Sequence, residues 1–194
     1  MARPQNPQRK PQLLAAIVEY LKDKSLAEVS FRSLAEGLGI SSYMLVYHFG
    51  QREQLIAEID ERIQAGRRWA LPAETSALGP AAFRRSLGRF WQASLQDGNR
   101  QLQRLGFEAA VRAPDDDGGS AAAGAYLSWA EAAAGWLRAQ GMPGPEAAAR
   151  GRMLAAAVHG LLYDYVLTGD RQQSTAAFEA LLDTFLAGLE VPRQ

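Results

Sequence analysis

The 194-residue sequence contains no cysteine, which excludes a disulfide framework and a thiolate metal site. Its 35 alanines and 24 leucines, against 16 valines, isoleucines and threonines together, are typical of an all-α protein. The 21 basic and 21 acidic side chains cancel, so net charge alone does not indicate a nucleic-acid partner. The N-terminus MARPQNPQRKPQ lacks an apolar signal-peptide core and no uncharged run is as long as a membrane span, so we expect a cytoplasmic protein.

Four helices are predicted in the first third of the chain, over residues 11–24, 30–38, 41–49 and 52–71. Apolar residues recur at helical spacing in the first and the fourth of them. Ser30 and Ser41 are suitable N-caps for the second and the third, and Gly39 interrupts the chain between these two. The second and third helices therefore form a short helical pair with a tight turn.

Five further helices follow, separated by glycine and proline, over about 80–97, 99–113, 120–140, 145–167 and 170–189. Pro80 suits the first position of its helix, and Asp170 with Gln173 resembles a capping box. The prediction is an all-α protein of about nine helices, with an N-terminal domain at 1–53 and a helical C-terminal domain at 54–194.

Residues 30–49, SFRSLAEGLGISSYMLVYHF, have the pattern of a helix-turn-helix. Ala35 supplies the small residue where two steeply crossed helices meet, and Gly39 tolerates the positive φ of the turn. The second helix of such a pair lies in the major groove with its N-terminal residues toward the base edges. Here those residues are Ser41, Ser42, Tyr43 and Met44.

Residues 13–55, LLAAIVEYLKDKSLAEVSFRSLAEGLGISSYMLVYHFGQREQL, resemble the N-terminal domain of the tetracycline-repressor (TetR) family of transcriptional regulators. The resemblance includes the run VSFRSLAEGLGIS, an aromatic cluster that ends in phenylalanine, and a basic-acidic step before a leucine. It implies a DNA-binding regulator, with the three-helix domain at 1–53 on DNA and the domain at 54–194 binding a ligand and a second subunit.

The resemblance assigns DNA contacts to ten residues: Ser30, Arg32, Ser41, Ser42, Tyr43, Met44, Val46, Tyr47, His48 and Arg52. Arg32, Ser42 and Tyr43 match base-reading positions. Met44 and Arg52 match positions that contact phosphate, and Tyr47 and His48 match an aromatic pair that positions the DNA backbone. The basic residues Arg3, Arg9 and Lys10 form either a minor-groove arm or a solubilising tail.

For the C-terminal domain, the resemblance implies a pocket for a small-molecule effector and a homodimer interface in the last two helices. Aromatic and polar residues that suit such a pocket are Trp69, Trp91, Phe107, Glu108, Tyr126, Trp129, Trp136, His159 and Tyr163. Each aromatic residue is, on its own, more often part of an ordinary core than of a pocket. A homodimer carries two reading heads, which predicts a palindromic operator, and the family implies repression that the effector relieves.

Two alternatives differ in class. A helical ligand-binding dimer without DNA binding is suggested by Ser42 and Val46, which stand where the family usually has lysine and tyrosine. An enzyme is not expected, since His159 and Asp164 are five residues apart and do not share a helix face well. The acidic run at 115–117 is followed by two glycines and indicates a solvated turn, so no metal site, cofactor or catalytic residue is predicted.

Overall fold

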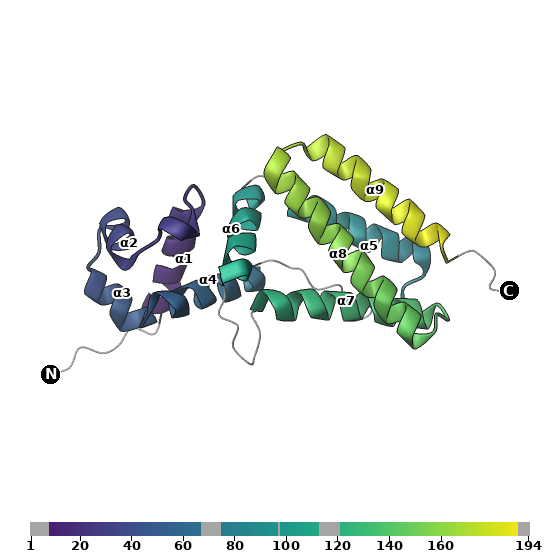
Figure 1. Cartoon of the computed structure of the whole chain (residues 1–194), viewed down its shortest axis with the longest axis horizontal. Helices are drawn as coiled ribbons and strands as arrows, with labels where there is room; N and C mark the ends of the chain where they lie inside the picture. The colour runs from purple at the N-terminus through teal and green to yellow at the C-terminus, as the bar shows by residue number, and fades with distance from the viewer. Residues whose placement is uncertain (1–7, 67–74, 97, 113–120, 190–194) are drawn as a thin grey trace. The chain divides into compact units, whose positions relative to one another are not determined.

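The computed structural model describes residues 8–66, 75–96, 98–112 and 121–189. Over these ranges the chain forms nine α-helices and no strand (Figure 1), which confirms the all-α prediction. The helices are α1 (Arg9–Leu21), α2 (Phe31–Leu38), α3 (Ser42–Phe49), α4 (Arg52–Gly66), α5 (Pro80–Ser94), α6 (Asn99–Arg112), α7 (Ala121–Ala139), α8 (Gly144–Thr168) and α9 (Arg171–Ala187), with two 3-10 turns, η1 (Leu26–Glu28) and η2 (Thr75–Ala77). None of these helices combines the length and the hydropathy needed to cross a membrane.

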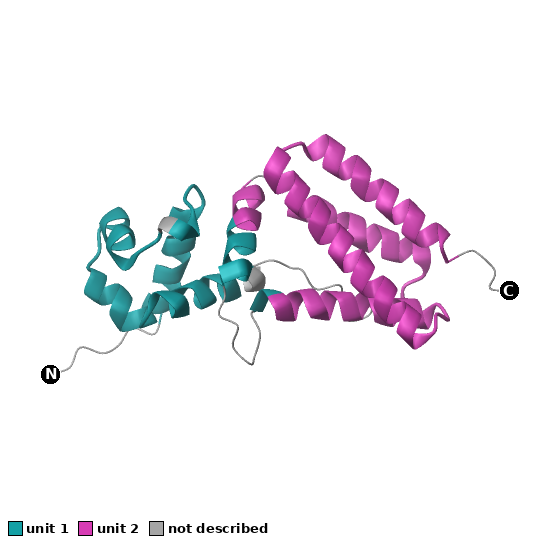
Figure 2. Cartoon of the chain, viewed as in Figure 1, with its two compact units in different colours: residues 1–67, 105–122 teal, residues 68–104, 123–194 magenta. Residues whose placement is uncertain are grey.

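The chain divides into two compact units (Figure 2). The head unit comprises residues 1–67 and 105–122, and the body unit comprises residues 68–104 and 123–194. Helix α6 contributes residues 99–104 to the body unit and residues 105–112 to the head unit. The division of function at residue 53 stays a prediction.

The head unit has one apolar core, to which each of its helices contributes. Ile17 and Leu21 of α1 and Leu55 and Ile59 of α4 are fully buried, at helical spacing on each helix. Helix α1 packs against α2 and α4, and α2 packs against α3. The short helices α2 and α3 are thus held by tertiary packing, because helices of eight residues are not stable alone.

The body unit is organised around two buried pairs of stacked aromatic rings. Phe83 of α5 lies face to face with Trp136 of α7, with ring centroids 3.8 Å apart. Trp91, two turns further along α5, stacks on Phe178 of α9 at 4.5 Å. Helix α5 therefore contacts α7 and α9 through its large side chains, and each pair removes a large apolar area from water.

Helices α7 and α8 approach each other closely at Gly151. A Cβ atom at this position would lie 2.6 Å from the carbonyl oxygen of Ala130 and 2.7 Å from the amide nitrogen of Ala134. Both of these are backbone atoms, which cannot rotate away as a side chain can. The crossing of α7 and α8 therefore depends on a residue without a side chain.

Candidate DNA-binding surface and ligand site

The bend between α2 and α3 is fixed by local hydrogen bonds. Ser30 caps α2: its hydroxyl accepts from the Ser33 amide at 3.1 Å, and the Ser33 hydroxyl accepts from the Ser30 amide at 3.0 Å. At the other end, Gly39 adopts φ 65°, and the Ile40 amide donates to the Ala35 carbonyl at 3.0 Å. Glycine adopts this left-handed conformation without strain, so the chain leaves α2 in a defined new direction, as predicted.

Helix α3 has one buried face and one exposed face. The Ser41 hydroxyl caps its first turn. Leu45 and Phe49 of α3 form the buried face. On the outer face Tyr43 is 77% exposed and Tyr47, one turn later, is 56% exposed. Their rings stack with centroids 6.4 Å apart. The first two turns of α3 therefore present two large aromatic side chains to the outside of the head unit.

Seven of the ten residues assigned to DNA are exposed: Ser30, Arg32, Ser41, Ser42, Tyr43, Val46 and Tyr47. Met44 and His48 are half-buried, and the His48 ring lies edge-on to Tyr47 at 5.1 Å. Most of the exposed set comes from the start of α3 and from the two caps that position α2 and α3. The structure thus brings these side chains together, and their contacts with DNA stay a prediction.

Arg52 does more than the resemblance implied. Its guanidinium donates to the carbonyl oxygens of Val29 at 2.8 Å and of Leu26 at 2.9 Å, in and after the turn η1. Glu108 of α6 binds the hydrogen-bond donors of the same turn. Its carboxylate accepts from the Leu26 amide at 2.7 Å and from the Ser25 hydroxyl at 3.3 Å. We call these four hydrogen bonds the η1 clamp. The assignments of Arg52 to phosphate and of Glu108 to a ligand miss this role, since both side chains hold the turn that leads into α2.

Arg52→Met is expected to lower the free energy of unfolding of the protein by about 2 kcal/mol, because two carbonyl groups lose charged donors. Arg62→Met is the matched control, since Arg62 is exposed on the same helix. Urea unfolding of both variants measures the effect. Equal stability of Arg52→Met and the wild type would mean that the η1 clamp contributes nothing.

Arg9 and Lys10 are the first two residues of α1, so neither of the two alternatives, a minor-groove arm or a solubilising tail, describes them. The Lys10 ammonium pairs with Glu58 at 2.7 Å and lies over the Phe49 ring, 5.5 Å from its centroid. Arg9 donates to the thioether sulfur of Met44 at 3.6 Å. Both cations thus connect the start of α1 to neighbouring helices of the head unit.

Two tryptophans of the body unit are core residues whose indole nitrogens are hydrogen-bonded within the protein. The Trp91 indole donates to the Thr175 hydroxyl at 3.0 Å, and the Trp136 indole donates to the Leu78 carbonyl at 2.7 Å. Both rings are fully buried and stacked as described above. Their polar atoms are satisfied within the protein, so these two residues offer a ligand no free hydrogen-bonding group.

Three other predicted ligand residues, with Phe90, form one aromatic cluster between α5, α7 and α8. His159 lies edge-on to Tyr126 at 5.0 Å and to Trp129 at 6.5 Å. Phe90 of α5, which is not among the predicted ligand residues, has its ring centroid 6.2 Å from that of Trp129. We call these four residues the body cluster.

The remaining candidates are dispersed. Tyr163 is 49% exposed on α8, and Phe107 is half-buried in the part of α6 that belongs to the head unit. Trp69, Arg3 and the acidic run at 115–117 lie outside the described residues.

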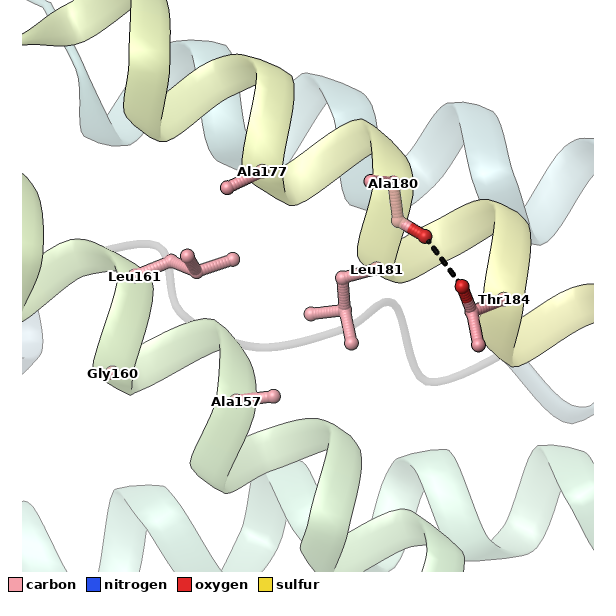
Figure 3. A pocket seen from close by; sticks show the side chains of 7 residues that line it. All are labelled: Ala157, Gly160, Leu161, Ala177, Ala180, Leu181 and Thr184. Carbon is pink, nitrogen blue, oxygen red and sulfur yellow. Dashed lines mark hydrogen bonds between the residues drawn. The ribbon is translucent and has the colours of Figure 1, made fainter.

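An apolar groove of about 440 Å³ runs between α8 and α9 (Figure 3). It is lined by Ala157, Gly160, Leu161, Ala177, Ala180, Leu181 and Thr184. The Thr184 hydroxyl donates to the Ala180 carbonyl at 2.9 Å, so this polar group is already satisfied. The two leucines point into the space between the helices, and most other lining residues are small. The groove therefore offers an open surface of low polarity on the last two helices.

No protein-family model and no curated protein sequence matches the chain. Solved structures match it over almost their whole lengths. A transcriptional regulator from Rhodococcus sp. Rha1 is 19% identical with a TM-score of 0.74, over 95% of this chain and 100% of that chain. A TetR variant from Acinetobacter baumannii AYE in complex with minocycline is 23% identical with a TM-score of 0.61, over 96% and 97%.

BioQ, in a crystal structure with its double-stranded DNA operator, is 20% identical with a TM-score of 0.63, over 93% of this chain and 97% of that chain. Because all three identities are below one quarter, the likeness concerns the fold. Each match covers more than nine-tenths of this chain and of the matched chain. The chain therefore has the fold of the TetR-family transcriptional regulators.

Proposed function

We propose that this protein is a transcriptional regulator that binds double-stranded DNA through α3, as a homodimer on a palindromic operator. The observation that carries the proposal is the outer face of α3. Tyr43 and Tyr47 are exposed there, at the start of the second helix of a bent pair, beside the polar Ser42. Such a helix fits the major groove, where its first residues reach base edges.

The exposure of these tyrosines supports a partner for this surface. An aromatic side chain left in water gains nothing from its apolar area, whereas the same side chain in a groove packs against sugars and thymine methyl groups. The structural relative BioQ was crystallised with its operator. The seven exposed residues of the DNA set give this surface hydroxyl groups, a guanidinium and two aromatic rings for contacts with phosphates and bases.

The groove between α8 and α9 supports the homodimer. Small residues such as Ala157 and Gly160 let the helices of a second copy approach closely, and Leu161 and Leu181 supply apolar area. Two copies that share their last two helices form a two-fold four-helix bundle with two reading heads. Such heads match a palindrome when the α3 helices are separated by about one DNA turn, roughly 34 Å, or more.

A small-molecule effector in the body unit is the proposed release signal, and repression is the proposed mode. The TetR relative was crystallised with minocycline. The body cluster of Phe90, Tyr126, Trp129 and His159 is the part of the body unit that we assign to the effector. Coupling of about 1–3 kcal/mol between the effector and the operator would change operator affinity roughly five- to 150-fold.

A second candidate is a cytoplasmic ligand-binding dimer that does not bind DNA. Ser42 and Val46 favour it, because neither places a positive charge on α3. We propose a regulator rather than an enzyme, since the structural relatives described above are a transcriptional regulator and a protein crystallised with its operator. Measuring DNA binding separates the two remaining candidates.

The experiment is a titration of duplex DNA at increasing salt with the wild type and Tyr43→Ala. For the wild type, the logarithm of affinity should fall with the logarithm of salt concentration, by about 0.9 per phosphate neutralised. Tyr43→Ala should weaken binding to the preferred sequence by about 1–3 kcal/mol per head and weaken binding to unrelated DNA less.

Two further variants serve as controls. Tyr43→Phe keeps the ring and removes the hydroxyl, which separates packing from hydrogen bonding. Val111→Ala removes another large side chain, 87% exposed, from outside α3 and should not affect DNA binding. An equal loss of specific and unrelated binding in Tyr43→Ala would remove Tyr43 from the base-reading set, and wild type without salt-dependent binding would favour the second candidate.

A further inference from the structure

Among the described residues of the body unit, three buried polar atoms have no hydrogen-bond partner, and two of them lie next to α5. These two are the indole nitrogen of Trp129, a residue that is 2% exposed, and the amide oxygen of Gln103, a residue that is 3% exposed. The Gln101 amide oxygen is also unpartnered, but two residues along a helix it faces the opposite side of α6 from Gln103. Proteins rarely leave such atoms unpaired, because burial removes the water that would satisfy them.

Trp129 and Gln103 both contact the last two turns of α5. The Phe90 ring lies 6.2 Å from Trp129. Ser94 follows Phe90 by one helical turn and donates to its carbonyl at 2.9 Å. The Gln103 amide nitrogen contacts the Ser94 carbonyl at 3.5 Å. Trp129 and Gln103 thus border the same stretch of α5 and differ in polarity: the indole needs an acceptor, and the amide oxygen needs a donor.

The surroundings of Trp129 are aromatic and rigid. His159 lies edge-on to both Trp129 and Tyr126. Its Nδ1 lies 2.8 Å from the Ala155 carbonyl, which can only accept, so this nitrogen carries the proton. Rings fixed in this way suit a flat ligand that makes stacked and edge contacts.

Every described carboxylate of the body unit is already engaged elsewhere. Glu131 pairs with Arg138, Glu146 with Arg150, Glu179 and Asp183 with Arg84, Asp164 accepts from Ser174, and Asp170 caps α9. A buried cation needs a paired anion, and none of these carboxylates is left for one. Arg152, which lies 4.7 Å over the Tyr126 ring, is exposed and remains in water.

We propose that the effector is a neutral, planar aromatic molecule that accepts a hydrogen bond from the Trp129 indole and donates one to the Gln103 amide oxygen. This inference rests on the proposed function and specifies the chemistry of its effector. It gives Trp129 a functional role that its packing does not require. Replacing Trp129 by phenylalanine removes an unsatisfied group from the empty protein and a binding group from the complex, so stability and affinity move in opposite directions.

The test uses three probes in calorimetric titrations of the full chain without DNA. 7-Hydroxycoumarin, at a pH that keeps its hydroxyl protonated, offers a donor and an acceptor; coumarin offers the acceptor alone; ethidium is flat and cationic. We expect 7-hydroxycoumarin to bind about tenfold more tightly than coumarin, and ethidium to bind most weakly, because each difference removes one hydrogen bond or buries an unpaired charge.

Trp129→Phe should weaken the binding of 7-hydroxycoumarin about tenfold. It should leave the midpoint of thermal unfolding of the ligand-free protein unchanged or raise it. Trp136→Phe is the matched control: it breaks the hydrogen bond to Leu78, so it should lower the midpoint and leave the affinity unchanged. Equal affinity for the two coumarins, no saturable binding of either, a preference for ethidium, or a Trp129→Phe variant with unchanged affinity would overturn the proposal. Because no DNA is present, these outcomes are independent of whether the protein binds an operator.

Discussion

Leu181→Glu is expected to convert the protein into a monomer and to lower its affinity for the operator about a hundredfold or more, because the second head loses its tether. Leu181 lies in the groove between α8 and α9, with Leu161 across from it (Figure 3). In the proposed dimer, a carboxylate at this position would be buried without a partner, which costs several kcal/mol. In the free protomer the same side chain is partly exposed, so the helix itself should fold.

Sedimentation velocity and an operator titration on the same sample measure both parts of this prediction. Gln172→Glu is the matched control, since it adds the same charge to α9 nine residues away, half a turn round the helix from Leu181. Gln172 is exposed and does not line the groove. A Leu181→Glu protein that sediments as the wild type does would place the dimer interface elsewhere.

Gly151→Val is expected to destabilise the body unit by about 3 kcal/mol or more, the upper part of the range for overpacked cores. The first side-chain atom would already lie within 2.9 Å of three atoms of Ala130 and Ala134, two of them backbone atoms. The two additional methyl groups of valine have no room unless α7 and α8 separate. Separation would uncover Leu154 and Val158, which are fully buried on α8.

Gly88→Ala provides the comparison for this variant. No atom lies within 4 Å of the Cβ position at Gly88, which is also helical. Alanine is therefore expected to raise stability there, by about 0.5–1 kcal/mol through helix propensity. Urea unfolding measures the free energy of unfolding of both variants. A Gly151→Val protein as stable as the wild type would mean that α7 and α8 do not cross as closely as described.

The helices were predictable because their signals are local. Ser30, Gly39 and Ser41 act through hydrogen bonds and dihedral angles within a few residues of themselves, so the bend between α2 and α3 can be read from a short window. The same holds for Asp170, whose carboxylate accepts from the Gln173 amide at 2.9 Å. The other half of the predicted capping box is replaced, because the Asp170 amide donates to the Thr168 hydroxyl at 3.1 Å and not to Gln173.

The side-chain roles that the sequence could not reveal depend on distant partners. Glu108 contacts the Leu26 amide across 82 positions of the chain, and its neighbours in sequence give no sign of that contact. Trp91 and Trp129 are alike in sequence terms, yet one indole finds Thr175 and the other finds no acceptor. Whether a polar atom is buried and paired depends on the tertiary structure. The predicted pocket residues can therefore be told apart from core residues only once the packing is known.

Helix α8 shows a second limit. Its 25 residues include many alanines and glycines, and small residues do not mark a helix face as clearly as large ones do. Tyr163, a predicted pocket residue, is 49% exposed on α8, and its place in a ligand pocket stays a prediction. The phase of an alanine-rich helix is set by what it packs against, here α7 at Gly151 and α9.

Selection of bound duplexes from a random DNA library tests most directly whether α3 reads sequence. We expect enrichment of an inverted repeat, with half-site centres separated by about one helical turn or more. Selection with Tyr43→Ala should return the same spacing with less preference at the bases that α3 contacts. A library that stays random after repeated rounds with the folded wild-type protein would mean that α3 does not read DNA sequence.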